Sequence, residues 1–202
     1  MKLYTGLGTN SQVVRHFARL KGVTLAEQWV DIATGENRAP AFLAKNSLGQ
    51  VPVLELASGQ CISQVTAICE YLEDEYPSPP LIGRSAEEKA ETRMWLRRLD
   101  LLILEPLVSA FRYGPGLPYY QKLQHCIPGA SAELKLVAEE NLAWLNRELA
   151  GRSSLCRGRF TLADIMLFAF VEFAGAALAL AITGEHLIAW QVAARHHLAT
   201  GA

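Results

Sequence analysis

The pattern of hydrophobic positions along the chain changes near residue 77. Before that point, short apolar runs alternate with helical segments, and after it apolar residues recur at helical spacing. The segment Pro77-Ser78-Pro79-Pro80 lies at the change, and consecutive prolines cannot continue a helix and favour extended backbone. The sequence therefore predicts an N-terminal domain over residues 1–76, a linker over 77–85 and an all-helical domain over 86–202.

The first domain is predicted to combine four strands with helices. Strand patterns cover residues 2–5, 28–31, 51–56 and 60–62, and the last two are joined by a Ser58-Gly59 turn. Helical patterns run from Ser11, the expected N-cap, to a stop at Gly22, and over 65–76. A βαβ crossover makes the first two strands parallel. The order β-α-β followed by β-β-α predicts an open sheet with a hairpin at one edge.

The second domain is predicted to contain only helices. One covers 85–112 with a kink at Pro106, others cover 131–149 and begin near residues 162 and 187, and residues 114–118 interrupt the series. The apolar run 165–182 is interpreted as a buried helix and not a membrane span, because Glu172 interrupts it. Thr161 and Asp164 suit a structural capping box, in which the Thr side chain takes an N3 amide and the Asp reaches back.

Composition and charge give no support for nucleic acid or an anionic membrane as a binding partner. Half of the residues are hydrophobic, 19% are charged and the formal net charge is -1, so no global field favours nucleic acid or an anionic membrane. The four cysteines form no C-x-x-C pair, and no secretory signal precedes the first strand, so a cytoplasmic location is expected. His196-His197 has no third ligand nearby in sequence, so no metal site is predicted.

Three blocks of sequence, residues 42–54 (FLAKNSLGQVPVL), 67–72 (AICEYL) and 160–165 (FTLADI), together resemble the cytosolic glutathione S-transferase family of bacterial type. Residues 42–54 (FLAKNSLGQVPVL) are similar to the family motif F-x-x-x-N-P-x-G-x-V-P-x-L, with Ser47 where proline is usual. Residues 67–72 (AICEYL) fit the same N-terminal domain, and residues 160–165 (FTLADI) are similar to the capping box of the helical domain. The resemblance implies an α/β thioredoxin-like domain, with a mixed four-stranded sheet and three helices, followed by an all-α helical bundle.

The resemblance implies glutathione as the ligand. In the family, the cysteinyl backbone of glutathione pairs with the residue before a cis-proline, which here is Val51 before Pro52. The γ-glutamyl carboxylate meets an acidic residue and a serine at a helix N-terminus, where this chain has Gln64-Val65. The candidates for the glycyl end are Arg38, Lys45 and Gln50.

Catalysis in the family requires a donor that stabilises the glutathione thiolate near the first helix. Four side chains compete for this role. Ser11 matches the serine-type members but also suits a cap. Asn10 stands where bacterial beta-type members carry cysteine, and asparagine there resembles members that work as glutathione-dependent disulfide reductases. Tyr4 lies near the tyrosine-type position but also suits sheet packing, and Thr9 is a fourth hydroxyl candidate.

The expected function is transfer of the glutathione thiolate to a small hydrophobic electrophile in detoxification, by a homodimer. Leu7, Phe111 and Tyr113 are expected to line the hydrophobic substrate pocket, although the aromatic residues also fit a core. Two alternatives stay open. One is a glutathione-dependent disulfide reductase or peroxidase, and the other is a non-catalytic binding or regulatory protein, which the Gln64-Val65 pair favours.

Overall fold

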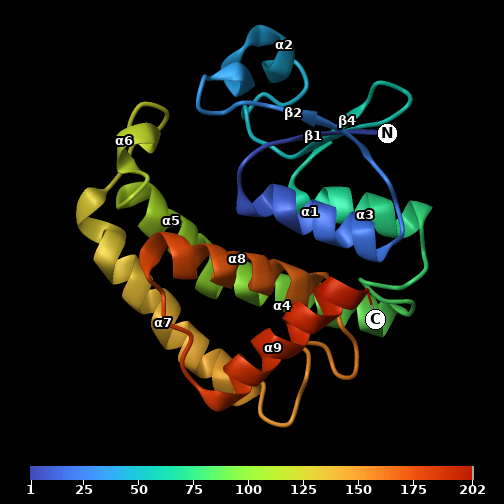
Figure 1. The fold of residues 1–202 in the computed structure, drawn as a ribbon, viewed down its shortest axis with the longest axis vertical. Helices are drawn as coiled ribbons and strands as arrows, with labels where there is room; N and C mark the ends of the chain where they lie inside the picture. Colours follow the sequence, from blue (N-terminus) through green and yellow to red (C-terminus); the bar gives the residue numbers. More distant parts are fainter. Residues whose placement is uncertain (202) are drawn as a thin grey trace. The chain divides into compact units, whose positions relative to one another are not determined.

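The computed structural model describes residues 1–201, which divide into two compact units over residues 1–82 and 83–200 (Figure 1). The boundary falls within residues 77–85, the segment that the sequence predicts as a linker. The first unit contains all the strands of the sheet, and the second is helical apart from one isolated bridge.

The predicted mixed four-stranded sheet is confirmed. It comprises β1 (Lys2–Thr5), β2 (Ala26–Trp29), β3 (Val53–Glu55) and β4 (Cys61–Ser63), in the order β2-β1-β3-β4. β1 and β2 run parallel, whereas β3 is antiparallel to both β1 and β4. β2 begins two residues earlier than predicted. Every residue of β2 is exposed, so no alternation of buried and exposed positions marks its limits.

Helices cover both faces of this sheet. Figure 1 shows α1 (Thr9–Leu20) and α3 (Val65–Glu75) side by side on one face, and α2 (Pro40–Leu43) beyond the other. Leu3 and Leu54 are register partners and fully buried. Because strand side chains alternate, Tyr4 and Val53 point to the opposite face, where they form a cluster with Val30 and Phe42. The sheet therefore separates two apolar layers.

A buried ion pair ties the end of α1 to the end of α3. The Lys21 ammonium contacts the Glu73 carboxylate and donates to the carbonyls of Tyr76, at 2.8 Å, and Pro79, at 2.5 Å. Glu73 in turn accepts the backbone N–H groups of Leu81 and Ile82 at 3.2 and 2.8 Å. The Lys21 side chain has no exposed surface and that of Glu73 is 6% exposed. The pair thus anchors the whole 76–82 segment.

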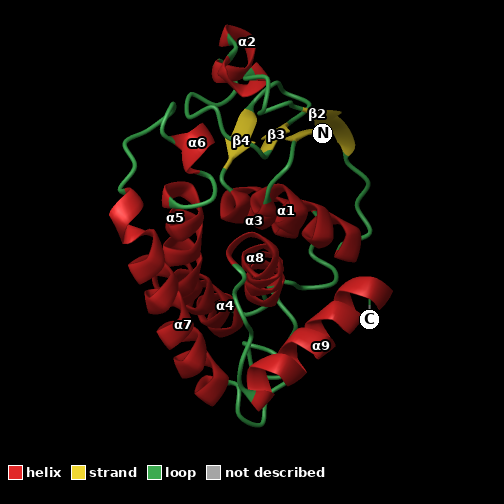
Figure 2. Ribbon diagram, turned by 60° about the vertical axis from the view of Figure 1, so that its left-hand side comes forward, coloured by secondary structure: helices red, strands yellow, loops and turns green. Residues whose placement is uncertain are grey.

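The second unit is a bundle of helices (Figure 2). They are α4 (Ala86–Leu99), η2 (Asp100–Leu104), α5 (Glu105–Tyr113), α6 (Leu117–Tyr120), η3 (Pro128–Ala130), α7 (Ser131–Glu148), α8 (Leu162–Leu178) and α9 (Glu185–Thr200). α8 contacts α4, α5 and α9, and most of its residues are buried. Within residues 1–201, no helix combines the length and apolar character needed to cross a bilayer.

The predicted single helix over 85–112 is wrong in its interior. The segment Asp100–Leu104 is a π-helical turn between α4 and α5. Pro106 has no N–H to donate to a carbonyl in the preceding turn, and a π segment is one way in which a helix accommodates such a gap. The interruption therefore precedes the proline instead of centring on it.

The carboxylate of Asp164 is the polar centre of this unit. It accepts the N–H and hydroxyl of Thr161, the N-cap residue of α8, at 3.0 and 3.2 Å. It also accepts the N–H of Leu155 and the indole N–H of Trp190, both at 2.9 Å. Asp164 therefore joins α8 to α9 and to the preceding loop. Burial nevertheless outweighs these hydrogen bonds and raises the pKa of Asp164 from 3.8 to about 6.

The raised pKa of Asp164 predicts a specific dependence of stability on pH. Between pH 4 and 6 the native carboxyl holds a proton that the unfolded chain releases. The stability that this proton contributes to the native state is fully present below about pH 4 and is lost as the pH rises through 6. At about 1.4 kcal/mol per pKa unit, the change is on the order of 3 kcal/mol. Urea unfolding of the wild type and Asp164→Asn at pH 4 and 7 measures it. If the free energy of unfolding changed equally between pH 4 and 7 in the wild type and in Asp164→Asn, the prediction would be wrong.

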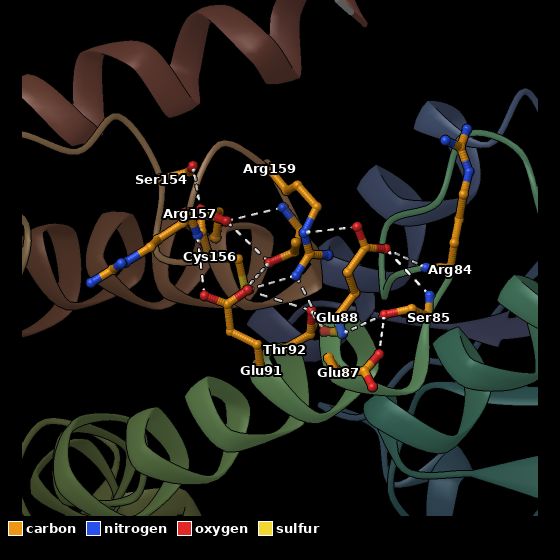
Figure 3. Close-up of polar contacts among 12 residues, drawn as sticks. Arg84, Ser85, Glu87, Glu88, Glu91, Thr92, Ser154, Cys156, Arg157 and Arg159 are labelled. Atoms are coloured by element: carbon orange, nitrogen blue, oxygen red, sulfur yellow. Dashed lines mark hydrogen bonds and ion pairs between the residues drawn. The ribbon is translucent and has the colours of Figure 1, made fainter.

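The loop before α8 is fixed to α4 by an arginine (Figure 3). Arg159 donates to the Glu91 carboxylate at 2.8 Å and to the Glu88 carbonyl at 3.2 Å, and the N–H of Arg157 donates to Glu91 at 3.2 Å. Below it, the buried Cys156 thiol lies 3.5 Å from the Thr92 hydroxyl, and burial raises its pKa. These contacts hold the segment that presents Leu155 to Asp164.

Candidate functional site

The turn before Val51 is held by three side-chain donors. The carbonyls of residues 48, 49 and 50 accept from Arg38 at 3.2 Å, from Asn37 at 2.7 Å and from Asn46 at 2.8 Å, in that order. Gly49 has φ 61°, and a Cβ there would lie 2.8 Å from the Asn37 carbonyl. A glycine is therefore needed at this position, both for its conformation and for the close approach.

The backbone of Val51 is available for pairing. The peptide bond between Val51 and Pro52 is cis. Val51 lies two residues before the start of β3, and its N–H and C=O make no hydrogen bond within residues 1–201. Its side chain packs against the cluster that contains Tyr4 and Val53, which fixes the residue while its polar groups stay open.

Gly6 brings the start of α1 next to Val51. A Cβ on Gly6 would lie 3.4 Å from the Val51 side chain and 2.9 Å from the Val30 carbonyl, so no larger residue fits without movement. The Gly6 N–H donates to the Ser11 hydroxyl oxygen at 3.4 Å. Gly6 thus links the Val51 side chain to Ser11 in the first turn of α1, within one compact unit.

The prediction that Ser11 caps the first helix is wrong. The N-cap residue is Gly8 and the helix begins at Thr9, so Ser11 lies inside the first turn. Ser11 is 1% exposed and its oxygen is used by Gly6. Thr9 is half-buried and Asn10 is exposed, and neither side chain has a hydrogen-bond partner among the described residues. Thr9 therefore presents a free hydroxyl at the positive end of a helix.

Tyr4 and Lys45 both engage Glu55. The Tyr4 hydroxyl donates to this carboxylate at 2.7 Å, and the Lys45 ammonium donates at 3.0 Å while it lies 4.8 Å from the centre of the Tyr4 ring. The hydrogen bonds from Tyr4 and Lys45 lower the pKa of Glu55, and those with Glu55 and Tyr4 raise the pKa of Lys45. Tyr4 and Lys45 therefore both have a structural partner in Glu55.

The N-terminus of α3 has a strained entry. Gln64, its N-cap residue, has φ 75° and ψ 126°, a conformation that non-glycine residues rarely adopt. Such strain costs on the order of 1–3 kcal/mol and is concentrated at functional sites. The side chain of Gln64 is exposed and makes no capping hydrogen bond, while Val65 starts the helix and is buried. An anion at this helix end would meet backbone N–H groups and the helix dipole.

The remaining predicted residues are distributed over both units. Arg38 and Gln50 are exposed at the turn before Val51, and Leu7 is 71% exposed in the loop before α1. Phe111 lies on α5 with its ring centre 5.0 Å from that of Phe173, and Tyr113 ends the same helix. Because Leu7 and the two aromatic residues belong to different units, their common pocket stays a prediction.

Asn37 was not predicted from the sequence. Its side chain is buried, with 4% exposure for the residue, and its Oδ1 atom has no partner among the described residues. A polar residue between Glu36 and Arg38 gives no sign of burial, because the whole stretch reads as a solvated connection. Within residues 1–201, no group of acidic, cysteine or histidine side chains could hold a metal ion.

The fold and this site define a class of protein that joins a thioredoxin-like domain to a helical domain. Residues 8–75 match the model of the glutathione S-transferase N-terminal domain, and residues 128–196 match that of the C-terminal domain. The crystal structure of a glutathione S-transferase domain-containing protein from Marinobacter aquaeolei VT8 is similar, with a TM-score of 0.91 and 35% identity. The similarity covers 100% of this chain and 99% of that one.

Two curated relatives extend the comparison. "Glutathione S-transferase 2" from Saccharomyces cerevisiae is 31% identical over 150 residues, which are 72% of this chain and 62% of the relative. "Maleylacetoacetate isomerase" from Pseudomonas aeruginosa is 41% identical over 96 residues, which are 46% of this chain and 45% of that protein. The matched part of the chain thus spans less than two thirds of each. The chain belongs to the glutathione S-transferase family.

Proposed function

We propose that this protein binds reduced glutathione and transfers its thiolate to a small hydrophobic electrophile. The observation that carries the proposal is the open backbone of Val51 next to the first turn of α1. A peptide-like ligand that pairs with an extended main chain gains backbone hydrogen bonds irrespective of the side chain at that position. The sulfur of such a ligand would then lie near a helix N-terminus, which stabilises negative charge.

Thr9 is the residue that we assign to the sulfur. Ser11 is buried, and the Tyr4 hydroxyl donates to Glu55, whereas Thr9 is half-buried and its hydroxyl makes no hydrogen bond among the described residues. A hydroxyl and helix amides that favour the thiolate would lower the thiol pKa of the ligand and raise the concentration of the nucleophile. Asn10 is exposed beside it and is the second candidate donor.

The two ends of glutathione are assigned to opposite sides of Val51. At the γ-glutamyl end, Gln64 offers an amide to the ligand ammonium and the N-terminus of α3 at Val65 offers positive potential to the carboxylate. At the glycyl end, Arg38 and Gln50 are exposed and near the turn. Lys45 is less suited because its ammonium is paired with Glu55.

Calorimetric titration with reduced glutathione tests the proposal. Binding in the millimolar range or tighter is expected, and no heat together with no thermal stabilisation would contradict it and favour a non-catalytic role. Conjugation of glutathione to 1-chloro-2,4-dinitrobenzene is then compared with reduction of hydroxyethyl disulfide. Activity on the disulfide alone would favour the reductase alternative.

The Gln64 site supports a gain-of-affinity prediction. Gln64→Glu keeps the size of the side chain and the backbone conformation but places a carboxylate opposite the ligand ammonium. An exposed ion pair contributes up to about 1 kcal/mol, so the Kd for glutathione is expected to fall about two- to fivefold. Gln60→Glu, at an exposed turn position, adds the same charge as a control. Equal effects of the two variants would contradict the assignment of Gln64.

A cytoplasmic homodimer completes the proposal. The four cysteines are all unpaired, which suits a reducing compartment. Sedimentation equilibrium tests the dimer, since the monomer mass is 22.2 kDa.

A further inference from the structure

The direction of the Val51 N–H is set by the turn that precedes it. In a trans peptide unit, the C=O of one residue and the N–H of the next lie in one plane and point in opposite directions. Asn46 holds the carbonyl of Gln50 at 2.8 Å, so the N–H of Val51 points away from Asn46. By the same reasoning, the bond of 2.7 Å from Asn37 to the Gly49 carbonyl directs the N–H of Gln50.

Asn37 differs from Asn46 in the element that it comes from, and from Arg38 in that it is buried. Asn46 belongs to the turn itself, where it also accepts the Leu48 N–H at 3.2 Å, and Arg38 is exposed. Asn37 reaches the turn from the short 3-10 helix Glu36–Arg38, and its side chain donates from a buried position. Its main-chain carbonyl oxygen also lies 2.8 Å from the position that a Cβ on Gly49 would take. Asn37 therefore contacts Gly49 twice.

A purely structural role accounts poorly for an amide in this position. The Oδ1 atom of Asn37 is buried without a hydrogen-bond partner among the described residues, which opposes folding. The other end of the amide, in contrast, makes the shortest of the three bonds to the turn. The favourable contact of the Asn37 side chain is therefore its hydrogen bond to the Gly49 carbonyl, which orients Gly49 and the residues after it.

We propose that Asn37 is a positioning residue for glutathione, which holds the Gly49 carbonyl so that Gln50 and the Val51 backbone are preorganised for the ligand. The inference rests on the proposed function, because it assigns to Asn37 the affinity of that same site. Preorganisation lowers the ordering cost of binding, so its loss weakens binding without changing the reacting atoms. Asn37 touches neither the sulfur nor the electrophile in this scheme.

The test compares Asn37→Ala and Asn37→Asp with Asn146→Ala. Asn37→Asp conserves volume but removes the N–H donor, and it serves if the alanine variant does not fold. Asn146 is the matched control, because its Oδ1 accepts the N–H groups of His186 and Leu187 at 3.1 and 2.9 Å in the second unit. All three variants lose side-chain-to-backbone hydrogen bonds and are expected to lose thermal stability.

Only the Asn37 variants are expected to change the site. The Kd and the KM for glutathione should rise about tenfold, with kcat within about twofold of the wild type. Exchange of the Gly49 amide hydrogen, which is donated to the Asn46 carbonyl at 2.8 Å, should accelerate without ligand. Unchanged affinity in Asn37→Asp, or unchanged exchange of the Gly49 amide, would overturn the inference. Absence of glutathione binding by the wild type would instead overturn the proposed function itself, which the wild-type titration shows separately.

Discussion

Lys21→Met is expected to destabilise the protein by about 3–5 kcal/mol, because it leaves the buried Glu73 carboxylate without its cation. The Tyr76 and Pro79 carbonyls lose a charged donor at the same time. Urea unfolding followed by circular dichroism measures the change. Lys21→Met combined with Glu73→Leu should recover part of the loss, since an apolar pair of similar volume tolerates burial better than one unpaired charge.

An exposed ion pair in the same unit supplies the control. Arg15 and Glu27 lie 3.0 Å apart with 34% and 41% of their side chains exposed, so Arg15→Met should change stability by less than about 1 kcal/mol. Similar losses for Arg15→Met and Lys21→Met would contradict the role assigned to burial.

Thr9→Val is expected to lower kcat/KM for glutathione conjugation about a hundredfold, whereas Thr9→Ser keeps most of the activity. Valine has the shape of threonine but no hydroxyl, so the thiolate loses one donor, and loss of one donor to a developing anion typically costs a factor of 10²–10³. The thiol pKa of bound glutathione, followed by thiolate absorbance, should rise in Thr9→Val only.

Ser11→Ala separates this effect from damage to the turn. It removes the acceptor of the Gly6 N–H in a buried position, so a loss of about 1–3 kcal/mol in stability is expected. The thiol pKa of bound glutathione should remain that of the wild type. A raised thiol pKa in Ser11→Ala, with none in Thr9→Val, would assign the sulfur to Ser11.

The local pattern of the sequence predicted the sheet and most helix limits. The Ser58-Gly59 hairpin, the end of α5 at Tyr113 and the start of α8 after Thr161 follow from turn and capping chemistry that acts over a few residues. The exposed strand β2 and the π turn before Pro106 carry no such signal, and their limits were misjudged. The limits of an element are therefore predictable from sequence where turn or capping residues stand at its ends.

The site was predictable only where a motif marked it. The segment around Val51 and Pro52 was recognised because several residues match one family pattern, whereas Asn37 and Lys21 act through partners that are distant in sequence. Lys21 and Glu73 are separated by more than fifty residues, and both would be assigned to the surface by residue type alone. Their roles depend on the tertiary fold, which single-residue propensities do not contain.

The contact between Trp190 and Asp164 gives the protein a built-in spectroscopic probe. Trp190 is fully buried and its indole N–H is donated to a carboxylate, whereas Trp29 is 51% exposed. The indole proton of Trp190 should therefore be well separated in an NMR spectrum and slow to exchange with solvent. Departure of α9 from α8 would alter that single resonance, so detachment of the C-terminal helix can be followed without an added label.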